Sequence, residues 1–356
     1  MSSISKASSV SGAAMASSPD LAPLFHGGDL GAARKLFPGA PEPFLDLSTG
    51  INPNPYPFAQ LSAKAFTELP QPEALARLVS LAAATYGAPS AAHVVAAPGS
   101  QIVMTWLAGS IAPGRATVLG PTYAEHARAA ELAGHEMAET RDLEQLGGAA
   151  LAIVVNPNNP DGRVVTRDAL LAVADRLRPH GGLLVVDEAF MEGGPEAESL
   201  AGETTRGNLV VLRSFGKFYG LPGLRLSFAL ASPDRAQRLA AALGPWPVSG
   251  AAIEIGAAAL ADLVWRTTTR AALEVAARRL DALLGQSGLK VIGGTSLFRL
   301  VQAPRAEALF RRLGEQGVLV RRFEGQPDWL RFGLPGGESD WQRLETALAT
   351  SGMLQT

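Results

Sequence analysis

The chain has no cysteine in its 356 residues, so it can form neither a disulfide bond nor a thiolate metal site. Its five histidines show no metal-ligand spacing, and we expect no metal. Charge is also sparse, because only 18% of the residues are charged and the net charge is −2. That balance gives no basic surface for a nucleic acid, and no apolar run is long enough to cross a membrane. We therefore expect a globular, cytoplasmic protein with neither of these partners.

Lysine is scarce as well, with five among 31 basic residues, so that arginine is the usual cation of this chain. One of the five, Lys217, stands in a glycine-flanked turn after the apolar run at 209–212. Lysine can lose its proton and form an imine with an aldehyde, whereas arginine stays charged. Ser214 and Arg225 flank this lysine, and both are good phosphate ligands. The three residues predict a pocket for pyridoxal 5'-phosphate (PLP), although Lys217 alone could be a solvated loop residue.

Two further apolar runs end in polar residues. The run at 182–186 ends at Asp187 and is typical of a strand that is buried on both faces. A buried carboxylate needs a partner, which the protonated pyridine nitrogen of PLP would supply, although an ordinary helix N-cap is the alternative. The run at 151–155 leads to Asn159, which is held extended by the proline after it. Its carboxamide could donate to the phenolate oxygen of PLP, with a simple Asx turn as the alternative.

An earlier turn predicts a phosphate cradle. Gly99, Ser100 and Gln101 follow a strand-like segment and begin an apolar helix, where backbone N–H groups are free to bind an anion. Tyr123 follows another short strand, and its ring could stack on a flat cofactor or simply pack half-buried.

These segments occur in one order: Asn-Pro-Asn-Asn-Pro-Asp-Gly at 156–162, Asp-Glu-Ala-Phe at 187–190 and Ser-Phe-Gly-Lys with its arginine at 214–225. In that order and spacing, from about residue 45 to 331, the chain resembles the fold-type I PLP enzymes of the aspartate aminotransferase superfamily. The resemblance implies that Lys217 holds PLP as an imine and that Asp187 pairs with the pyridine nitrogen. The other implied cofactor contacts are Asn159 at the phenolate oxygen, Tyr123 against the ring, and Gly99, Ser100, Gln101, Ser214 and Arg225 around the phosphate.

The resemblance also implies a homodimer in which Tyr56 reaches the phosphate in the partner's active site. Two branches of the superfamily remain open. One comprises histidinol-phosphate aminotransferases, which use 2-oxoglutarate or glutamate, and the other the threonine-phosphate decarboxylases of cobalamin biosynthesis. The segments at 26–29 and 44–53 resemble the decarboxylase branch, although Asp29 replaces its usual asparagine. Phe190, where aminotransferases usually have tyrosine, favours the same branch, although it could be mere packing.

The decarboxylase reading implies a small phosphorylated amino acid as substrate, L-threonine O-3-phosphate, and (R)-1-amino-2-propanol O-2-phosphate as product. The candidate anchors for the phosphate and carboxylate of the substrate are His26, Asn159, Arg321 and Arg331, and the resemblance gives the carboxylate to Arg331. Which anion each residue holds stays open otherwise. Arg322 could exchange roles with Arg321, and both could be surface charges.

Short apolar strands alternate with amphipathic helices in the middle of the chain, which predicts an α/β fold with a mostly parallel sheet and helices on both faces. A smaller α+β domain should follow. We expect a disordered Ser/Ala-rich tail at 1–20, an arm at 21–55 that packs on the small domain, a large PLP-binding domain at 56–246 and the small domain at 247–356. Predicted strands lie near 93–97, 116–119, 150–156, 182–187, 208–213, 225–230, 289–292, 296–301, 318–321 and 329–333. Predicted helices lie at 100–111, 123–133, 166–178, 232–243, 251–284 (broken near Arg266), 304–316 and 339–350.

Overall fold

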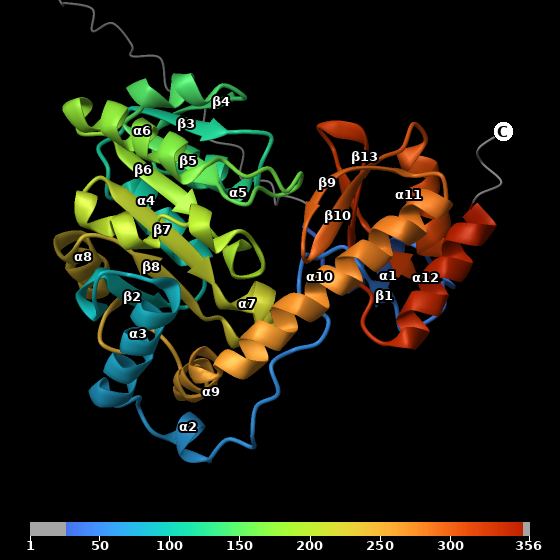
Figure 1. Cartoon of the computed structure of the whole chain (residues 1–356), viewed down its shortest axis with the longest axis horizontal. Helices are drawn as coiled ribbons and strands as arrows, with labels where there is room; N and C mark the ends of the chain where they lie inside the picture. Colours follow the sequence, from blue (N-terminus) through green and yellow to red (C-terminus); the bar gives the residue numbers. More distant parts are fainter. Residues whose placement is uncertain (1–25, 352–356) are drawn as a thin grey trace, which may run out of the picture.

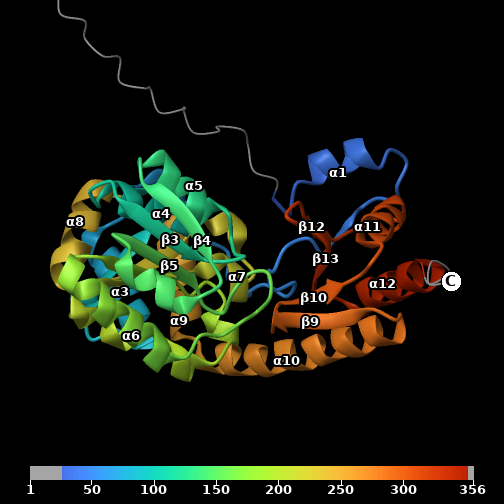
Figure 2. The same cartoon turned by 90° about the horizontal axis from the view of Figure 1, so that it is seen from above.

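The computed structural model describes residues 26–351, and the predicted tail at 1–20 lies outside them. Two assemblies of strands and helices stand side by side, and the long helix α10 (Leu263–Gln286) runs from one to the other (Figure 1). Figure 2 shows α10 along one side of both assemblies. Among the described helices, none combines the length and the apolar character that a bilayer crossing requires.

A seven-stranded sheet forms the centre of the larger assembly, in the order β2-β8-β7-β6-β5-β3-β4. Neighbouring strands are parallel except at β8, which is antiparallel to both β2 and β7. The central strands are apolar and buried throughout, as their sequence predicted. The predicted mostly parallel sheet is therefore confirmed. The strands are β2 (Val94–Ala97), β3 (Arg115–Leu119), β4 (Glu136–Thr140), β5 (Leu151–Val155), β6 (Leu183–Asp187), β7 (Leu209–Ser214) and β8 (Ser227–Leu230).

Helices cover both faces of this sheet. Successive strand residues point to opposite faces, so Val185 belongs to one apolar cluster and Val186 to the other. The first cluster includes side chains of α4 (Ser100–Gly109), α5 (Glu125–Leu132) and α8 (Pro233–Leu243). The second includes side chains of α3 (Pro72–Tyr86), α6 (Arg167–Leu177) and α9 (Gly250–Ala261).

The smaller assembly is an antiparallel sheet in the order β12-β13-β10-β9, with helices packed on it. The N-terminal arm joins this assembly, because β1 (Leu45–Asp46) pairs in parallel with β11 (Val318–Leu319). After α1 (Leu30–Leu36), the ring of Phe37 packs 5.5 Å from that of Phe310. The predicted fold class is confirmed by both sheets. The remaining elements are β9 (Lys290–Thr295), β10 (Phe298–Gln302), β12 (Arg321–Phe323), β13 (Gln326–Gly333), α2 (Lys64–Thr67), α7 (Phe215–Phe218), α11 (Ala306–Glu315) and α12 (Glu338–Ser351).

Several features differ from the sequence predictions, among them the short helices α1 and α2, which were not predicted, and the strand predicted at 318–321, which is the two strands β11 and β12. Strand β4 was missed because it is a polar edge strand, Glu-Met-Ala-Glu-Thr, without an apolar run. Helix α3, which begins at Pro72 as the first helical residue, was missed as well. The long stretch predicted at 251–284 is two helices that part at Asp262, whose side chain caps α10, and not near Arg266.

Helix α9 packs against α3, where a Cβ at Gly256 would lie 3.1 Å from the Leu78 side chain. It therefore lies with the larger sheet, although it follows the proposed boundary between residues 246 and 247. The division of the chain at that boundary stays a prediction.

Candidate active site

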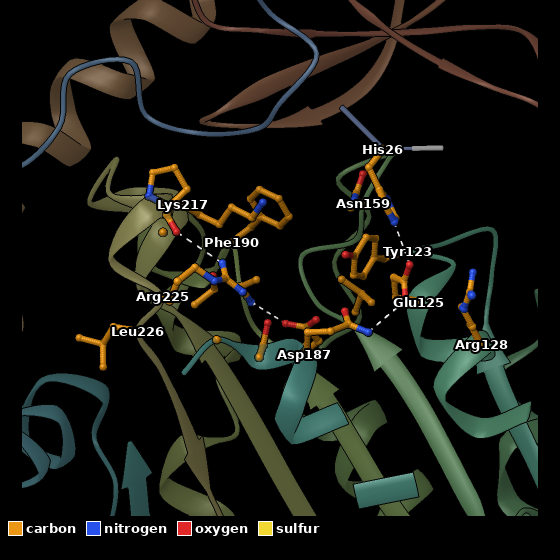
Figure 3. Close-up of a pocket in the computed structure, with 18 residues that line it drawn as sticks. His26, Tyr123, Glu125, Arg128, Asn159, Asp187, Phe190, Lys217, Arg225 and Leu226 are labelled. Carbon is orange, nitrogen blue, oxygen red and sulfur yellow. Dashed lines mark hydrogen bonds and ion pairs between the residues drawn. The ribbon is translucent and has the colours of Figure 1, made fainter. Parts of the chain in front are cut away.

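A cavity of about 640 Å³ opens at the carboxyl ends of β5, β6 and β7, where the polar residues of three sequence segments converge (Figure 3). A second cavity of about 510 Å³ adjoins it and shares five lining residues with it: His26, Tyr123, Asn159, Phe190 and Lys217. Most of the predicted site is therefore brought together. The first cavity is lined by Gly99, Ser100, Gln101, Tyr123, Asn159, Asp187, Ser214, Lys217, Arg225 and His26, and the second adds Arg321 and Arg331.

Lys217 lies on the short helix α7, directly after β7, at the wall shared by both cavities. Burial lowers the pKa of Lys217 to about 8, and the positive charge of Arg331 acts in the same direction. The Nζ atom lies 5.7 Å from the ring centroid of Phe190. An amine of this pKa is partly neutral near physiological pH, as a lysine that forms an imine must be.

Asp187 is held from both sides at the end of β6. Its Oδ2 atom is 2.9 Å from Nε2 of His126, and its Oδ1 atom accepts a 3.1 Å hydrogen bond from the Ala189 N–H. Both the carboxylate and the imidazole are buried. Sequence reasoning missed His126, which belongs to no motif and meets Asp187 only through the fold. The pair fixes the carboxylate at the cavity wall, where it can face a cationic ring nitrogen.

The N-terminus of α4 forms an anion cradle. Gly99 has a φ of 93°, and a Cβ at this position would lie 2.4 Å from Nη2 of Arg225. Only glycine therefore lets the guanidinium approach the helix start. Ser100 and Ser214 add hydroxyls to the same cavity. A helix N-terminus, two hydroxyls and a guanidinium are a donor set that fits a phosphate dianion.

Gln101 does not turn its amide nitrogen to this cradle. Its Nε2 atom donates to Glu125 Oε2 at 3.0 Å, and Glu125 Oε1 lies 2.8 Å from Nε2 of His26. Glu125, which sequence reasoning also missed, thus links the N-terminal arm to α4 across the cavity (Figure 3). The predicted role of Gln101 as a phosphate ligand stays a prediction.

Tyr123 lies between two histidine rings, 5.9 Å from His26 and 6.0 Å from His126 between centroids. Burial raises the pKa of Tyr123 to about 12, so its hydroxyl stays protonated. Its ring lines both cavities, as a stacking partner for a flat cofactor must.

Arg331 on β13 is buried and binds only uncharged oxygens among the described residues. Its Nη1 donates to Asn159 Oδ1, and its Nη2 donates to the Ser48 carbonyl at 2.8 Å. Burial lowers the pKa of Arg331 to about 9. The bond to Oδ1 also orients the Asn159 carboxamide, so that its amide nitrogen points away from Arg331.

The other predicted anchors differ in their surroundings. Arg321 lines the second cavity, with its guanidinium carbon 5.6 Å from the Phe323 ring centroid. Arg322 also reaches that cavity, but its Nη1 atom lies 2.9 Å from Oε2 of Glu307, an exposed pair. Both arginines therefore line the second cavity, and the choice between them stays a prediction.

Tyr56 is not among the residues that line either cavity of its own chain. It is buried, with its ring 5.1 Å from Trp265 in an edge-on contact. Burial raises its pKa. Its predicted contact with a partner's phosphate stays a prediction.

The comparisons with known proteins decide the family. The family model for aminotransferase class I and II matches residues 50–347. The chain belongs to this family. A threonine-phosphate decarboxylase from a Sinorhizobium species is 42% identical to it over 92% of this chain and 98% of that protein. A threonine-phosphate decarboxylase from Pseudomonas aeruginosa is also 42% identical, over 91% of this chain and 97% of its own length.

Solved structures of this family share the fold. Histidinol-phosphate aminotransferase from Sinorhizobium meliloti, in complex with PLP, aligns with a TM-score of 0.73 and 22% identity over 83% of this chain and 85% of that chain. Membership of the family confirms the predicted recognition, the fold and PLP as the cofactor. The individual residue roles within the site remain predictions.

Proposed function

We propose that this protein decarboxylates L-threonine O-3-phosphate to (R)-1-amino-2-propanol O-2-phosphate with PLP as cofactor. The proposal is supported by two threonine-phosphate decarboxylases that are each 42% identical to it over more than nine tenths of its length. It is also supported by Phe190, which contacts the site but carries no hydroxyl.

The observation that carries the proposal of a carboxylate-bearing substrate is the state of Arg331, and the choice of decarboxylation over transamination rests on the two relatives and on Phe190. A buried guanidinium is costly unless it meets an anion, yet the hydrogen bonds of Arg331 go to the uncharged Asn159 and Ser48 oxygens, and the charge of Asp46 acts on it without a direct bond. A substrate carboxylate would place a negative charge directly on the guanidinium, in a cavity that Lys217 also lines. Arg321 and His26 line the same cavity and are proposed to bind the substrate phosphate. The site then suits a substrate with an amine, a carboxylate and a phosphate.

Residues of the first cavity are proposed to hold the cofactor. Its phosphate would lie at the α4 N-terminus among Ser100, Ser214 and Arg225, and Asp187 would pair with its ring nitrogen. His126 would keep Asp187 in place. Bound PLP supplies an electron sink that weakens whichever Cα bond of the substrate stands perpendicular to its ring.

The chain's own residues would then choose the reaction. By holding the carboxylate, Arg331 would set which Cα bond is perpendicular to the ring, because binding energy away from the reacting bond fixes orientation. Lys217 would hold a proton on Nζ and give it to Cα after CO2 has left. Burial lowers the pKa of the free Lys217 amine to about 8, which makes it a stronger proton donor than an ordinary lysine.

We also propose that the protein acts in the cytoplasm, in cobalamin biosynthesis, as a homodimer to which Tyr56 contributes across the interface. Cobalamin carries an aminopropanol-derived side arm, which supports the proposed place of the product. The family resemblance supports the dimer. Within its own chain Tyr56 packs on Trp265. From that position it would have to reach the phosphate in the partner's active site.

The test is to incubate the purified protein and PLP with threonine phosphate and no oxo acid. We expect one CO2 and one aminopropanol phosphate for each substrate consumed, and none from Lys217→Ala. Lys290→Ala is the matched control, because Lys290 is an exposed lysine on β9. Turnover that requires 2-oxoglutarate and histidinol phosphate would instead assign an aminotransferase.

A further inference from the structure

The end of β9 and the first residue of the turn that follows it, residues 293–296, are called the β9–β10 turn below and contact two active-site loops that are distant in sequence. On one side, β9 meets the loop after β5, which carries Asn159. The Gly294 N–H donates to the Asp161 carbonyl at 2.9 Å. A Cβ at Gly293 would lie 2.0 Å from that carbonyl oxygen, and one at Gly162 would lie 1.9 Å from the Gly294 oxygen. The two backbones therefore touch directly, with no room for a side chain.

On its other side the turn meets the loop after β6, which carries Phe190. The Ser296 hydroxyl donates to the Gly193 carbonyl at 2.7 Å. A Cβ at Gly193 would lie 2.3 Å from Ser296 Oγ, so this contact is also tight. Just past the turn, the Phe298 ring packs edge-on against Phe190 at 5.2 Å. The loop that carries Asn159 and the loop that carries Phe190 thus both contact the same short turn.

The same hairpin carries the sheet that contains Arg331. Strand β10 pairs with β13 in a register that places Leu300 opposite Arg331. Within the smaller assembly the hairpin is fixed by Arg299, whose Nε donates to Asp281 of α10 at 2.5 Å. The turn therefore connects the sheet that carries Arg331 to the loops of Asn159 and Phe190, in addition to the direct hydrogen bond from Arg331 to Asn159.

We propose that the β9–β10 turn, residues 293–296, is a positioning element that sets where Arg331 holds the substrate carboxylate relative to Lys217. The proposal deepens the proposed function and rests on it, because Arg331 is the anchor proposed there. Close-packed backbone cannot take up an added methyl group without moving. A displacement of the carboxylate anchor by about 1 Å can cost on the order of a hundredfold in rate.

The first test is Gly293→Ala, with Gly285→Ala as the control. Gly285 lies in α10 and has no atom within 4 Å of an added Cβ. Binding is measured by calorimetry in the Lys217→Ala background with PLP, where no turnover occurs. Two ligands are compared: threonine phosphate and the aminopropanol phosphate, which lacks the carboxylate. We expect Gly293→Ala to weaken the binding of threonine phosphate at least tenfold and the binding of the aminopropanol phosphate less than threefold. The control variant should bind both ligands as before.

A merely structural role would weaken both ligands by the same factor, and that result, or no weakening at all, would overturn the proposal. Ser296→Ala removes one hydrogen bond without a clash. It should weaken threonine phosphate about fivefold, the equivalent of ~1 kcal/mol.

The second test uses the absence of cysteine from the chain. The Ser296 Cβ lies 3.6 Å from the position of a Cβ at Gly193, within the usual range for a disulfide. The double variant Gly193→Cys/Ser296→Cys should therefore form one bond that locks the turn to the loop after β6. If the turn is a fixed support, the oxidised enzyme decarboxylates threonine phosphate with at least the kcat/KM of its reduced form.

Loss of activity on oxidation that a reductant restores would show that the turn must separate from the loop, and would overturn the proposal. Failure of the proposed function gives a different result, since wild-type protein would then release no CO2. The calorimetric comparison needs binding of threonine phosphate but no turnover, so it tests the role of the turn separately from the reaction.

Discussion

Replacement of Arg331 by leucine should remove the carboxylate anchor and the hydrogen bond that orients Asn159, while the phosphate cradle and Asp187 stay in place. Arg331 has two η nitrogens near the second cavity and no carboxylate partner among the described residues. A hydrogen bond to a charged group contributes about 1.5–3 kcal/mol, so two of them at the lower end amount to ~3–4 kcal/mol. We therefore expect kcat/KM for threonine phosphate to fall on the order of 10²- to 10³-fold.

The same substitution should change the titration of Lys217. The charge of Arg331 is, after burial, the largest cause that lowers the pKa of Lys217 below its usual value. Its removal raises that pKa, so the limb of the pH profile that reports Lys217 moves to higher pH.

The assay is CO2 release measured across pH for wild type, Arg331→Leu and the control Arg311→Leu. Arg311 is an exposed arginine of α11 that pairs with Glu307 and lines neither cavity. Its variant should stay within about threefold of wild type, as expected for an exposed ion pair. A kcat/KM for Arg331→Leu that stays within the same range, or a Lys217 limb that moves to lower pH, would refute the assignment of the anchor.

Three further outcomes follow from the site. His126→Phe should lower kcat about tenfold or more, because Asp187 loses a buried hydrogen bond, and rates measured at saturating PLP would show it. Gly99→Ala should weaken PLP binding on the order of tenfold in a spectroscopic titration, because the new Cβ meets Arg225. Gly39→Ala is the control, because Gly39 also has a positive φ but no atom within 4 Å of an added Cβ, and it should leave PLP binding unchanged. Between about pH 8 and the usual lysine value of 10.5 the unfolded chain binds more protons at Lys217 than the folded one, so this group makes the PLP-free protein more stable as pH rises. Thermal unfolding of wild type and Lys217→Met should therefore diverge over that interval; parallel curves would contradict it.

The sequence predicts best what is encoded locally. Apolar runs such as 182–186 are typical of buried strands, and the polar residue at the end of such a strand is then expected at the sheet edge where ligands bind. Lys217 and Asp187 are therefore predictable from their own segments of the sequence. Strand β4 is not, because an edge strand is half solvated and its residues keep no apolar run.

Contacts between distant segments were not predictable in the same way. His126 meets Asp187 across 61 residues, and Arg331 meets Asn159 across 172. Neither pair has a local pattern, since each partner is positioned by a different element. Glycine pairs such as Gly162 and Gly294 show the same limit, because their need for close approach appears only when the two backbones are placed together.

Every role proposed for this site depends on a covalent bond between PLP and the side chain at position 217. The decisive experiment is borohydride reduction of the PLP-loaded protein, followed by mass analysis of its peptides. We expect one added cofactor mass, on the peptide that contains Lys217. An adduct on Lys35, Lys64 or Lys290 instead, or no adduct at all, would contradict it.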